Sequence, residues 1–260
     1  MIRPPIHRAA AVGFGTSADA YERGRPGYPD ETVAFVKELL GGPDAERAAV
    51  LDLAAGTGIF TGALVDAGIE PVAAEPVEGM RSILQRSLPG ITVVAAVAES
   101  IPFAGCSFDA VMVAQALHWF DPSRALPEIA RVLRPGGMLV IAFNVRDGTD
   151  ALSAGLAEIW EEYRSDTPTH RSAAWRRPFE HQPWFSPLRL RSFSQRQHVD
   201  AQGLVDRVLS VSFVASLPGD ERSRVAKRVE ALARGRAEME LPYRTDVWWT
   251  ARQPGSAISE

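Results

Sequence analysis

The amino-acid sequence predicts a doubly wound α/β fold, in which a mostly parallel sheet of seven strands carries helices on both faces. Short apolar runs typical of buried strands alternate along the chain with amphipathic helical segments. A turn containing Gly56 and Gly58 follows the first strand, and Glu75 ends the second. Sheets of this class bind ligands at the carboxyl ends of their strands, so we expect a site where these residues meet.

Length and composition narrow the class of protein. The chain has 260 residues, 46% of them hydrophobic, so it can bury a substantial core. Its net charge of −4 argues against a nucleic-acid-binding protein. Cys106 is the only cysteine, and no apolar run is long enough for a signal sequence or a membrane span. We therefore expect a cytoplasmic monomer or homodimer that contacts neither nucleic acid nor membrane.

The first strand and its loop occupy residues 50–58. Residues 50–53 form a near-continuous apolar run, as expected of a strand buried on both faces. Gly56 and Gly58 permit a sharp turn in which backbone N–H groups approach a ligand at the start of the next helix. That helix carries apolar residues at i, i+3, i+4 and i+7 from Phe60. The alternative is that the glycines only make a tight turn.

The segment before the first strand divides into three parts. Residues 1–15 show little periodicity and predict a flexible arm. Residues 16–29 are rich in aromatic residues, arginines and turn formers, and two prolines hold Arg25 and Tyr28 on a stiff turn. Surface packing alone is the alternative reason for that turn. Asp30 is then expected to cap a helix that ends at the next Gly-Gly-Pro run.

The second and third strands end near acidic residues. Glu75 closes the strand predicted at 70–75, and a solvated strand end is the alternative interpretation of this carboxylate. The third strand is predicted at 91–97, and Ala98 and Glu99 follow it. Glu99 is either a ligand-binding residue or a surface carboxylate.

The fourth strand, predicted at 110–114, runs into Gln115-Ala116-Leu117-His118-Trp119-Phe120-Asp121-Pro122. Strand ends are where open α/β sheets place their chemistry, so polar and aromatic residues here are informative. The ring face of Trp119 can attract a positive group. His118 can act as a general base near pH 7, or it can be a structural hydrogen-bonding residue beside Trp119.

A helix through Leu133 leads to the fifth strand at 138–143, and the composition then changes. In residues 144–187 aromatic side chains are interleaved with arginines and two histidines, which suits a cap over an acidic molecule. A helical cap with core aromatics and solvated arginines is the alternative. The histidines have no cysteine or acidic partner at ligand spacing, so no metal site is predicted.

The remaining residues, 188–251, are expected to complete the sheet. Alternating apolar and polar residues predict a half-exposed sixth strand at 188–199. Two helices follow, and a last strand is predicted at 241–251. Residues 252–260 are expected to form a frayed tail.

Several of these runs resemble motifs of the class I S-adenosylmethionine (SAM) dependent methyltransferases. Residues 52–58, Asp-Leu-Ala-Ala-Gly-Thr-Gly, resemble motif I of that family. Residues 21–29 resemble the Y-x-x-x-R-P-x-Y-P element that precedes motif I in many small-molecule methyltransferases. Residues 98–103 resemble the D-A-E-x-L-P-F segment, and residues 114–120 resemble the A-Q-A-x-H-W-F motif IV of the subgroup with the trans-aconitate methyltransferase-like enzymes.

The resemblance implies a Rossmann-like fold with an antiparallel last strand and a helical lid inserted after the fifth strand. Residues 16–143 are then the SAM-binding core, with a lid segment at 16–29, and residues 144–187 are the substrate cap. The implied cofactor-binding residues are Tyr21, Arg25, Ala54, Gly56, Thr57, Gly58, Glu75, Pro76, Met80, Ala98, Glu99 and Gln115. The implied substrate residues are Tyr28, Trp119, Trp160, Tyr163 and Trp175, with His118 as a base or a substrate contact.

Two residues depart from the family pattern. Ala54 stands where the family usually has its first glycine. Val97 stands where an aspartate often takes the adenine amino group, so the adenine is expected to be held by backbone groups near Ala98 and by packing.

The predicted function is direct in-line transfer of the sulfonium methyl group of SAM to an O, N or C nucleophile of a small molecule, with a carboxylic acid as one candidate and no metal. A SAM-binding protein of this fold that catalyses another reaction is the alternative. A nicotinamide-dependent oxidoreductase is disfavoured because the loop lacks the G-x-G-x-x-G spacing. A nucleic-acid methyltransferase is disfavoured by the charge and by the absence of an N-P-P-Y-type motif.

Overall fold

A computed structural model describes residues 24–164, 167–172 and 174–254. Its centre is a seven-stranded sheet in the order β3-β2-β1-β4-β5-β7-β6. The strand β7 is antiparallel to β5 and β6, and the remaining pairs are parallel. The predicted doubly wound fold and its antiparallel last strand are therefore confirmed. The strands are β1 (Val50–Leu53), β2 (Val72–Ala74), β3 (Val93–Val94), β4 (Phe108–Ala114), β5 (Leu133–Arg146), β6 (Arg189–Val199) and β7 (Met239–Ala251).

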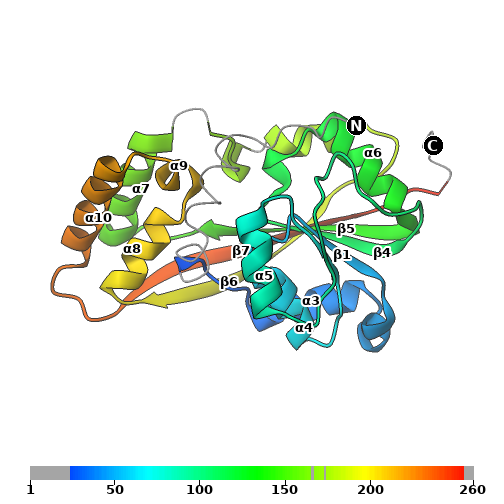
Figure 1. Ribbon diagram of the computed structural model, residues 1–260, viewed down its shortest axis with the longest axis horizontal. Coiled ribbons are helices and arrows are strands. Elements are labelled where there is room, and N and C mark those ends of the chain that lie inside the picture. Colours follow the sequence, from blue (N-terminus) through cyan, green and yellow to red (C-terminus); the bar gives the residue numbers. More distant parts are fainter. Residues whose placement is uncertain (1–23, 165–166, 173, 255–260) are drawn as a thin grey trace.

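Helices cover both faces of this sheet and also form a separate group at one end of it (Figure 1). None of the described helices is long and apolar enough to cross a lipid bilayer. The α-helices are α3 (Asp30–Leu39), α4 (Ile59–Asp66), α5 (Glu78–Ser87), α6 (Pro122–Val132), α7 (Ala151–Arg164), α8 (Ala201–Leu209), α9 (Ser212–Ala215) and α10 (Gly219–Ala233). Short 3-10 helices are η1 (Gly42–Arg47), η2 (Leu117–Trp119), η3 (His170–Ser172) and η4 (Ala174–Phe179).

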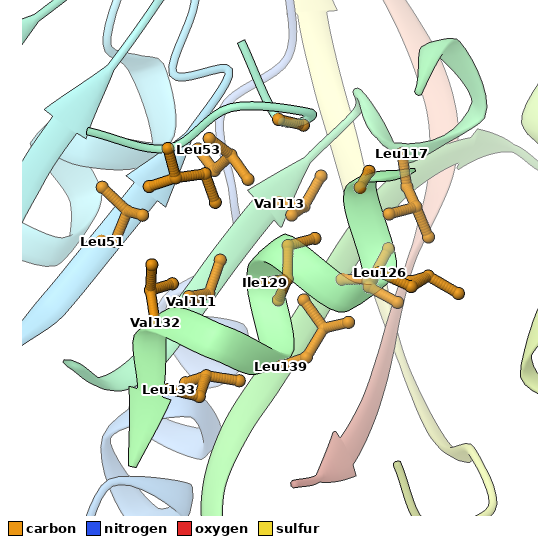
Figure 2. Close-up of a cluster of buried hydrophobic side chains, with 14 of the residues drawn as sticks. Leu51, Leu53, Val111, Val113, Leu117, Leu126, Ile129, Val132, Leu133 and Leu139 are labelled. Atoms are coloured by element: carbon orange, nitrogen blue, oxygen red, sulfur yellow. The ribbon is translucent and has the colours of Figure 1, made fainter. Parts of the chain in front are cut away.

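Side chains of the central strands alternate between two apolar clusters, one on each face. Leu51 and Val111 belong to the cluster that contains Leu126 and Ile129 of α6 (Figure 2). Their neighbours along the strands, such as Val50 and Met112, belong to the cluster that contains residues of α3 and α4. Because successive residues of a strand point to opposite faces, this alternation explains why the strand sequences are apolar throughout.

A third apolar cluster lies beyond the sheet. It joins α7, α8, α9 and α10 to the far ends of β6 and β7, through residues such as Trp160, Leu204, Val229 and Tyr243. Figure 1 shows these helices grouped around the extended β6–β7 pair, at the opposite end from α6. In contrast, Phe179 and Phe185 pack on the cluster that contains α6. The aromatic residues of 144–187 are thus divided between two cores, and the helical group draws also on residues after 187.

Three local predictions were wrong. Asp30 does not cap α3, because Pro29 is the N-cap residue and Asp30 lies in the first turn, where its charge favours the helix dipole. The helix before the fifth strand ends at Val132, and Leu133 already pairs with β4. The third strand has only two residues, Val93 and Val94, because it is the edge of the sheet and pairs only with β2.

The tail also differs from the prediction. Arg252 was expected to fray, but its N–H donates to the carbonyl of Gly137 at 2.8 Å, and the N–H of Gln253 donates to the carbonyl of Trp184 at 2.8 Å. These hydrogen bonds extend the pairing of β7 by two residues. The predicted arm, residues 1–15, and residues 255–260 lie outside the described part of the chain.

Candidate active site

The loop after β1 uses backbone conformations that few residues adopt. Ala54, Gly56 and Gly58 have φ values of 60°, 62° and 93°. A Cβ atom on Gly58 would lie 3.0 Å from Cγ of Leu84, so glycine is needed there for both conformation and space. The chain then enters α4, whose first-turn N–H groups have no partner within the helix. Ala55, Gly56 and Gly58 donate their own N–H groups within the protein, so the backbone donors that face a ligand here are those of the first turn of α4.

Glu75 lies directly after β2 and is tied to this loop. Its side chain is buried, and its carboxylate oxygens accept hydrogen bonds from the N–H groups of Gly56 at 2.9 Å and Val77 at 2.7 Å. Burial raises the pKa of Glu75 to about 7, although the two hydrogen bonds and the nearby Arg81 lower it. With 4% of its surface exposed, Glu75 is not a solvated strand end.

A second buried carboxyl group lies beneath the loop. Asp52 in β1 is fully buried, and its Oδ2 accepts a hydrogen bond from Oγ1 of Thr61 at 2.6 Å. Burial raises the pKa of Asp52 to about 6, while this hydrogen bond lowers it. The pair fixes the strand to the first turn of α4 and so sets the shape of the loop.

Residues 24–29, which we name the strap, cross the carboxyl ends of the strands. Nδ2 of Asn144, near the end of β5, donates to the carbonyl of Gly27 at 3.0 Å. Nε2 of Gln197 in β6 donates to the carbonyl of Gly24 at 3.1 Å. These bonds join segments more than 100 residues apart in the sequence.

The strap also contacts the helical group. Nη2 of Arg25 donates to the carbonyl of Ser210, the residue that follows α8, at 3.0 Å. Gly24 lies so close to α8 that a Cβ atom there would be 2.5 Å from the carbonyl carbon of Asp206. A glycine is therefore needed at this crossing, and the strap is held between the sheet and α8.

A cleft of about 480 Å³, which we name the loop cleft, opens between the strap and the loop after β1. Its lining includes the polar residues Asn144 and Arg207, which the sequence analysis did not single out. Several of the predicted site residues also line it. These are Arg25, Tyr28, Ala54, Gly56, Thr57 and Gln115.

A second cleft, the arginine cleft, lies on the other side of Arg25 and encloses about 810 Å³, part of it open to solvent. Its walls come from the strap, η2, the end of β5, α7, η3 and the α8–α9 corner. Arg25, Arg146, Arg164 and Arg207 line it, and its described lining contains no aspartate or glutamate. The two clefts share Arg25, Gln115, Asn144 and Arg207, so they meet along this set of side chains.

Trp160 forms the centre of one wall of the arginine cleft. The guanidinium carbon of Arg146 lies 3.4 Å from the centroid of its ring, and that of Arg207 lies 5.6 Å away. Both cations are thus held over an aromatic ring face, which stabilises positive charge. The predicted substrate residue Trp160 therefore contributes to the cleft mainly by positioning two arginines.

His118 lies in η2, at the wall of the arginine cleft. Burial lowers its pKa to about 3, with smaller contributions from His170 and the positive charge of Arg25. Its Nδ1 is buried and has no hydrogen-bond partner among the described residues. His118 is accordingly neutral at pH 7 and can exchange a hydrogen bond with a ligand, but it is a weak base.

The other predicted aromatic residues lie in different places. Trp119 lines the arginine cleft. Tyr28 lines the loop cleft, where its ring packs edge to face on Phe60 with centroids 4.7 Å apart. Trp175 lines a neighbouring, largely apolar cavity. Tyr163 is in neither cleft, and its hydroxyl group bonds to Glu221 of α10 at 3.3 Å.

The remaining predicted cofactor residues do not line either cleft in the described part of the chain. Met80 and Ala98 are each 3% exposed, and Oε1 of Glu99 accepts a hydrogen bond from the N–H of Asp121 at 2.8 Å. Tyr21 lies outside the described residues. The rest of this set, Gly58, Glu75 and Pro76, belongs to the loop and strand end beside the loop cleft.

Three residues of the clefts were not predicted, although the sequence carries a signal for each of them. Asn144 and Arg146 come directly after the fifth strand as predicted at 138–143, and lie at the carboxyl end of β5 in the structure, so the rule that drew attention to His118 could have found them. Arg207 falls three residues after Leu204, on the apolar stripe of α8, where a charged residue is unexpected. Among the described residues no group of three histidine, cysteine or acidic side chains could hold a metal ion.

Comparisons with known proteins agree with this architecture. Residues 51–141 match a family model described as a methyltransferase domain. An uncharacterized methyltransferase of Mycobacterium tuberculosis is 39% identical over 225 residues, which cover 86% of this chain and 87% of the relative. A demethylmenaquinone methyltransferase of Renibacterium salmoninarum is 41% identical over 109 residues, covering 42% of this chain and 45% of that enzyme.

Among solved structures, a protein of Anaeromyxobacter dehalogenans described as a type II methyltransferase superposes with a TM-score of 0.65. The match covers 88% of this chain and 99% of that protein, at 22% sequence identity. At this identity the likeness concerns the fold, and it extends to the helical group as well as the sheet.

Proposed function

The chain belongs to the class I SAM-dependent methyltransferases, and we propose that it methylates a small organic anion held in the arginine cleft. In this proposal the loop cleft holds SAM and the arginine cleft holds the methyl acceptor. The observation that carries the proposal is the set of four arginines, without any acidic residue among the described lining residues, in a cleft that adjoins the loop after β1. Such a lining favours a carboxylate over a neutral or cationic acceptor.

The residues of the loop cleft fit the cofactor. Glu75 is fixed by two backbone N–H groups, yet a carboxylate has acceptor capacity for further hydrogen bonds, such as those from ribose hydroxyl groups. Gly56 and Gly58 allow the backbone to approach a ligand closely. When bound, SAM would supply the methyl group of its positively charged sulfonium: an in-line nucleophile forms a bond to the methyl carbon, and S-adenosylhomocysteine leaves with the electron pair of the broken carbon–sulfur bond. The protein contributes alignment of the two molecules and exclusion of water.

The state of His118 agrees with an acidic acceptor. A neutral imidazole adds no positive charge beside a sulfonium, and with a pKa of about 3 it is poorly suited to take a proton from an acceptor at pH 7. A carboxylate oxygen needs no such step, because it is already deprotonated and carries a lone pair for the methyl group. We therefore assign His118 a hydrogen bond to the acceptor through Nδ1, rather than proton removal.

The first test is calorimetric titration of the purified protein with SAM, S-adenosylhomocysteine and NAD(P)H in parallel. We expect micromolar binding of the first two and none of the third. The protein is then incubated with SAM and either adipate, benzoate or citrate, with the corresponding primary amides as controls, and S-adenosylhomocysteine and the methylated product are quantified by mass spectrometry. Methylation of an acid but not of its amide supports the proposal. Transfer to the amides, or SAM binding without methylation of any of the acids, would overturn it.

The proposal includes a small-molecule partner and a monomer or homodimer in the cytoplasm, without nucleic acid or membrane contacts. The overall charge of −4 supports it, because a nucleic-acid enzyme needs a basic surface. Strong, salt-sensitive binding of RNA in a filter assay would contradict this part of the proposal.

A further inference from the structure

Arg207 is a buried cation that the protein leaves incompletely bonded. It lies in α8 with 6% of its surface exposed. Its Nε donates a hydrogen bond to the hydroxyl group of Tyr243 at 2.7 Å. Among the described residues, its buried Nη1 has no hydrogen-bond partner and the side chain forms no ion pair. A guanidinium group carries five N–H donors, so most of its bonding capacity is unused.

Burying the Arg207 guanidinium with so few hydrogen bonds costs free energy unless a further group binds to it. A guanidinium group is a cation, and burial removes the water that would otherwise solvate its charge. A buried charge without a partner is strongly destabilising in a folded protein. The ring of Trp160, 5.6 Å from the guanidinium carbon, offsets only part of this cost. The physical expectation is an anion that arrives as a ligand.

The position of Arg207 defines where that anion would bind. The residue lines both clefts, together with Arg25, Gln115 and Asn144. Its bond to Tyr243 of β7 fixes the direction of the guanidinium group, and α8 is itself held against the strap at Gly24. Arg207 is thus a pre-positioned donor at the junction of the clefts.

We propose that Arg207 binds a ligand carboxylate at the junction of the two clefts and is the main determinant of affinity for it. The planar guanidinium fork matches a carboxylate with two parallel hydrogen bonds. This inference rests on the proposed function. Two ligands of that reaction can supply the group: the methionine part of SAM, and an acidic methyl acceptor. Both ligands would present the same chemical group, a carboxylate, to Arg207. Binding experiments can distinguish which of the two ligands supplies it.

The test compares the wild-type protein with Arg207→Gln, Arg207→Lys and a control, Arg224→Gln. Arg224 is an exposed residue of α10 that pairs with Glu221, outside both clefts. Calorimetry measures binding of SAM and of decarboxylated SAM, which lacks the methionine carboxylate. A second series measures binding of adipate and benzoate, and of their amides, to the complex with S-adenosylhomocysteine.

If the anion is the cofactor carboxylate, Arg207→Gln weakens SAM binding at least tenfold and leaves the binding of decarboxylated SAM unchanged. If it is the acceptor carboxylate, SAM binding stays within twofold, and adipate or benzoate binds at least tenfold more weakly, with no change for the amides. Arg207→Lys retains the charge but not the fork, so it recovers only part of the loss. Arg224→Gln should behave as the wild type in every series.

A stability measurement separates ligand binding from a structural role. Because the charge is uncompensated in the free protein, Arg207→Gln should unfold at the same or a higher temperature than the wild type without ligand. A lower melting temperature with unchanged binding of SAM and of the acids would overturn the inference, as would acids that do not bind the wild-type complex when SAM affinity is also insensitive to Arg207. A wild-type protein that does not bind SAM at all would instead refute the proposed function.

Discussion

The loop cleft and the arginine cleft meet at the same side chains but are built in different ways. The loop side of the loop cleft is held by contacts between residues close together in the sequence, such as Glu75 with Gly56 and Asp52 with Thr61. The arginine cleft joins residues of the strap, β5, α7 and α8, which are distant in the chain. Local motifs therefore determine the loop side of the first cleft, whereas tertiary packing determines its other side and the whole of the second cleft.

The buried ionisable groups at the clefts also differ in how many hydrogen bonds the protein gives them. Both carboxyl groups beside the loop cleft accept hydrogen bonds from the protein itself, and burial raises their pKa values toward neutrality. The Arg207 guanidinium, in contrast, makes one hydrogen bond to a described residue, from Nε to the hydroxyl group of Tyr243. The carboxyl groups beside the loop are thus bonded by the protein itself, whereas Arg207, at the junction of the clefts, has donors left for a ligand.

The largest expected effect on stability comes from displacing the strap, which contributes to both clefts, from α8. Gly24→Ala places a methyl group 2.5 Å from the backbone of α8, and we expect the free energy of unfolding to fall by about 3 kcal/mol. Gly27→Ala is the matched control, since a Cβ atom there has nothing within 4 Å. Urea denaturation of both variants measures the difference.

The same pair of variants tests whether the strap holds both clefts together. Arg25 lines both, so displacement of the strap by Gly24→Ala should weaken binding of SAM and of the acceptor together. Equal stability and equal SAM affinity of the Gly24→Ala and Gly27→Ala proteins would show that the close contact with α8 has no role.

The next effect tests the buried charge beside the loop cleft. The pKa of Glu75 is about 7 in the folded protein and 4.5 as its ordinary value, so the folded state binds more protons between these pH values. Stability should therefore fall as pH rises through this window, by about 2.5 kcal/mol between pH 5 and pH 8 from Glu75 alone. Asp52 acts in the same direction up to about pH 6, and His118 in the opposite direction between about pH 3 and 6.5.

Glu75→Gln isolates the contribution of this residue from the other two. The difference in unfolding free energy between the wild type and Glu75→Gln should change by the predicted amount across the window, while any constant offset reflects the altered hydrogen bonds. Denaturation curves at half-unit pH intervals provide the measurement. Parallel stability profiles for the two proteins would mean that Glu75 is ionised normally.

A smaller effect concerns the cofactor directly. Glu75→Ala should weaken SAM binding by at least ~1.5 kcal/mol, or about tenfold, because it removes charge-assisted hydrogen bonds to the ribose and releases the N–H of Gly56. Calorimetry at pH 8, where Glu75 is ionised, gives the cleanest value. Glu99→Ala is a useful comparison, since Glu99 accepts a hydrogen bond from Asp121 and lines neither cleft. Unchanged affinity in Glu75→Ala would remove Glu75 from the site.

Some parts of the fold and of the site could be predicted from the sequence, and others could not. The strands were predictable because buried parallel strands are apolar on both faces, and Leu51 and Val50 do pack in opposite cores. The helical group was only partly predictable, because α7 packs with helices that follow β6 in sequence. The position of Arg207 on the apolar stripe of α8 was a local sign of burial, but its role could not be assigned, because Trp160 and Tyr243, which hold it, are distant in the sequence.

The smallest predicted effect on stability concerns Ala54, whose backbone conformation accounts for the glycine that the family usually has there. The resemblance to motif I places a glycine at this position, and the structure gives a physical reason, because Ala54 has a φ of 60°. An L-residue in this conformation costs about 1–2 kcal/mol, and the extra backbone freedom of an unfolded glycine offsets about 0.5–1 kcal/mol of the gain. Ala54→Gly should therefore stabilise the protein by up to ~1 kcal/mol.

Ala55→Gly is the control for this prediction, because Ala55 also lines the loop cleft but has no positive φ. It should lose about 0.5–1 kcal/mol of stability from backbone entropy alone. Denaturation midpoints of the two variants should thus move in opposite directions. If Ala54→Gly is stabilised and its SAM affinity is unchanged, the family glycine is explained by backbone conformation. A gain in affinity would instead show that the methyl group of Ala54 limits how closely the cofactor approaches the loop.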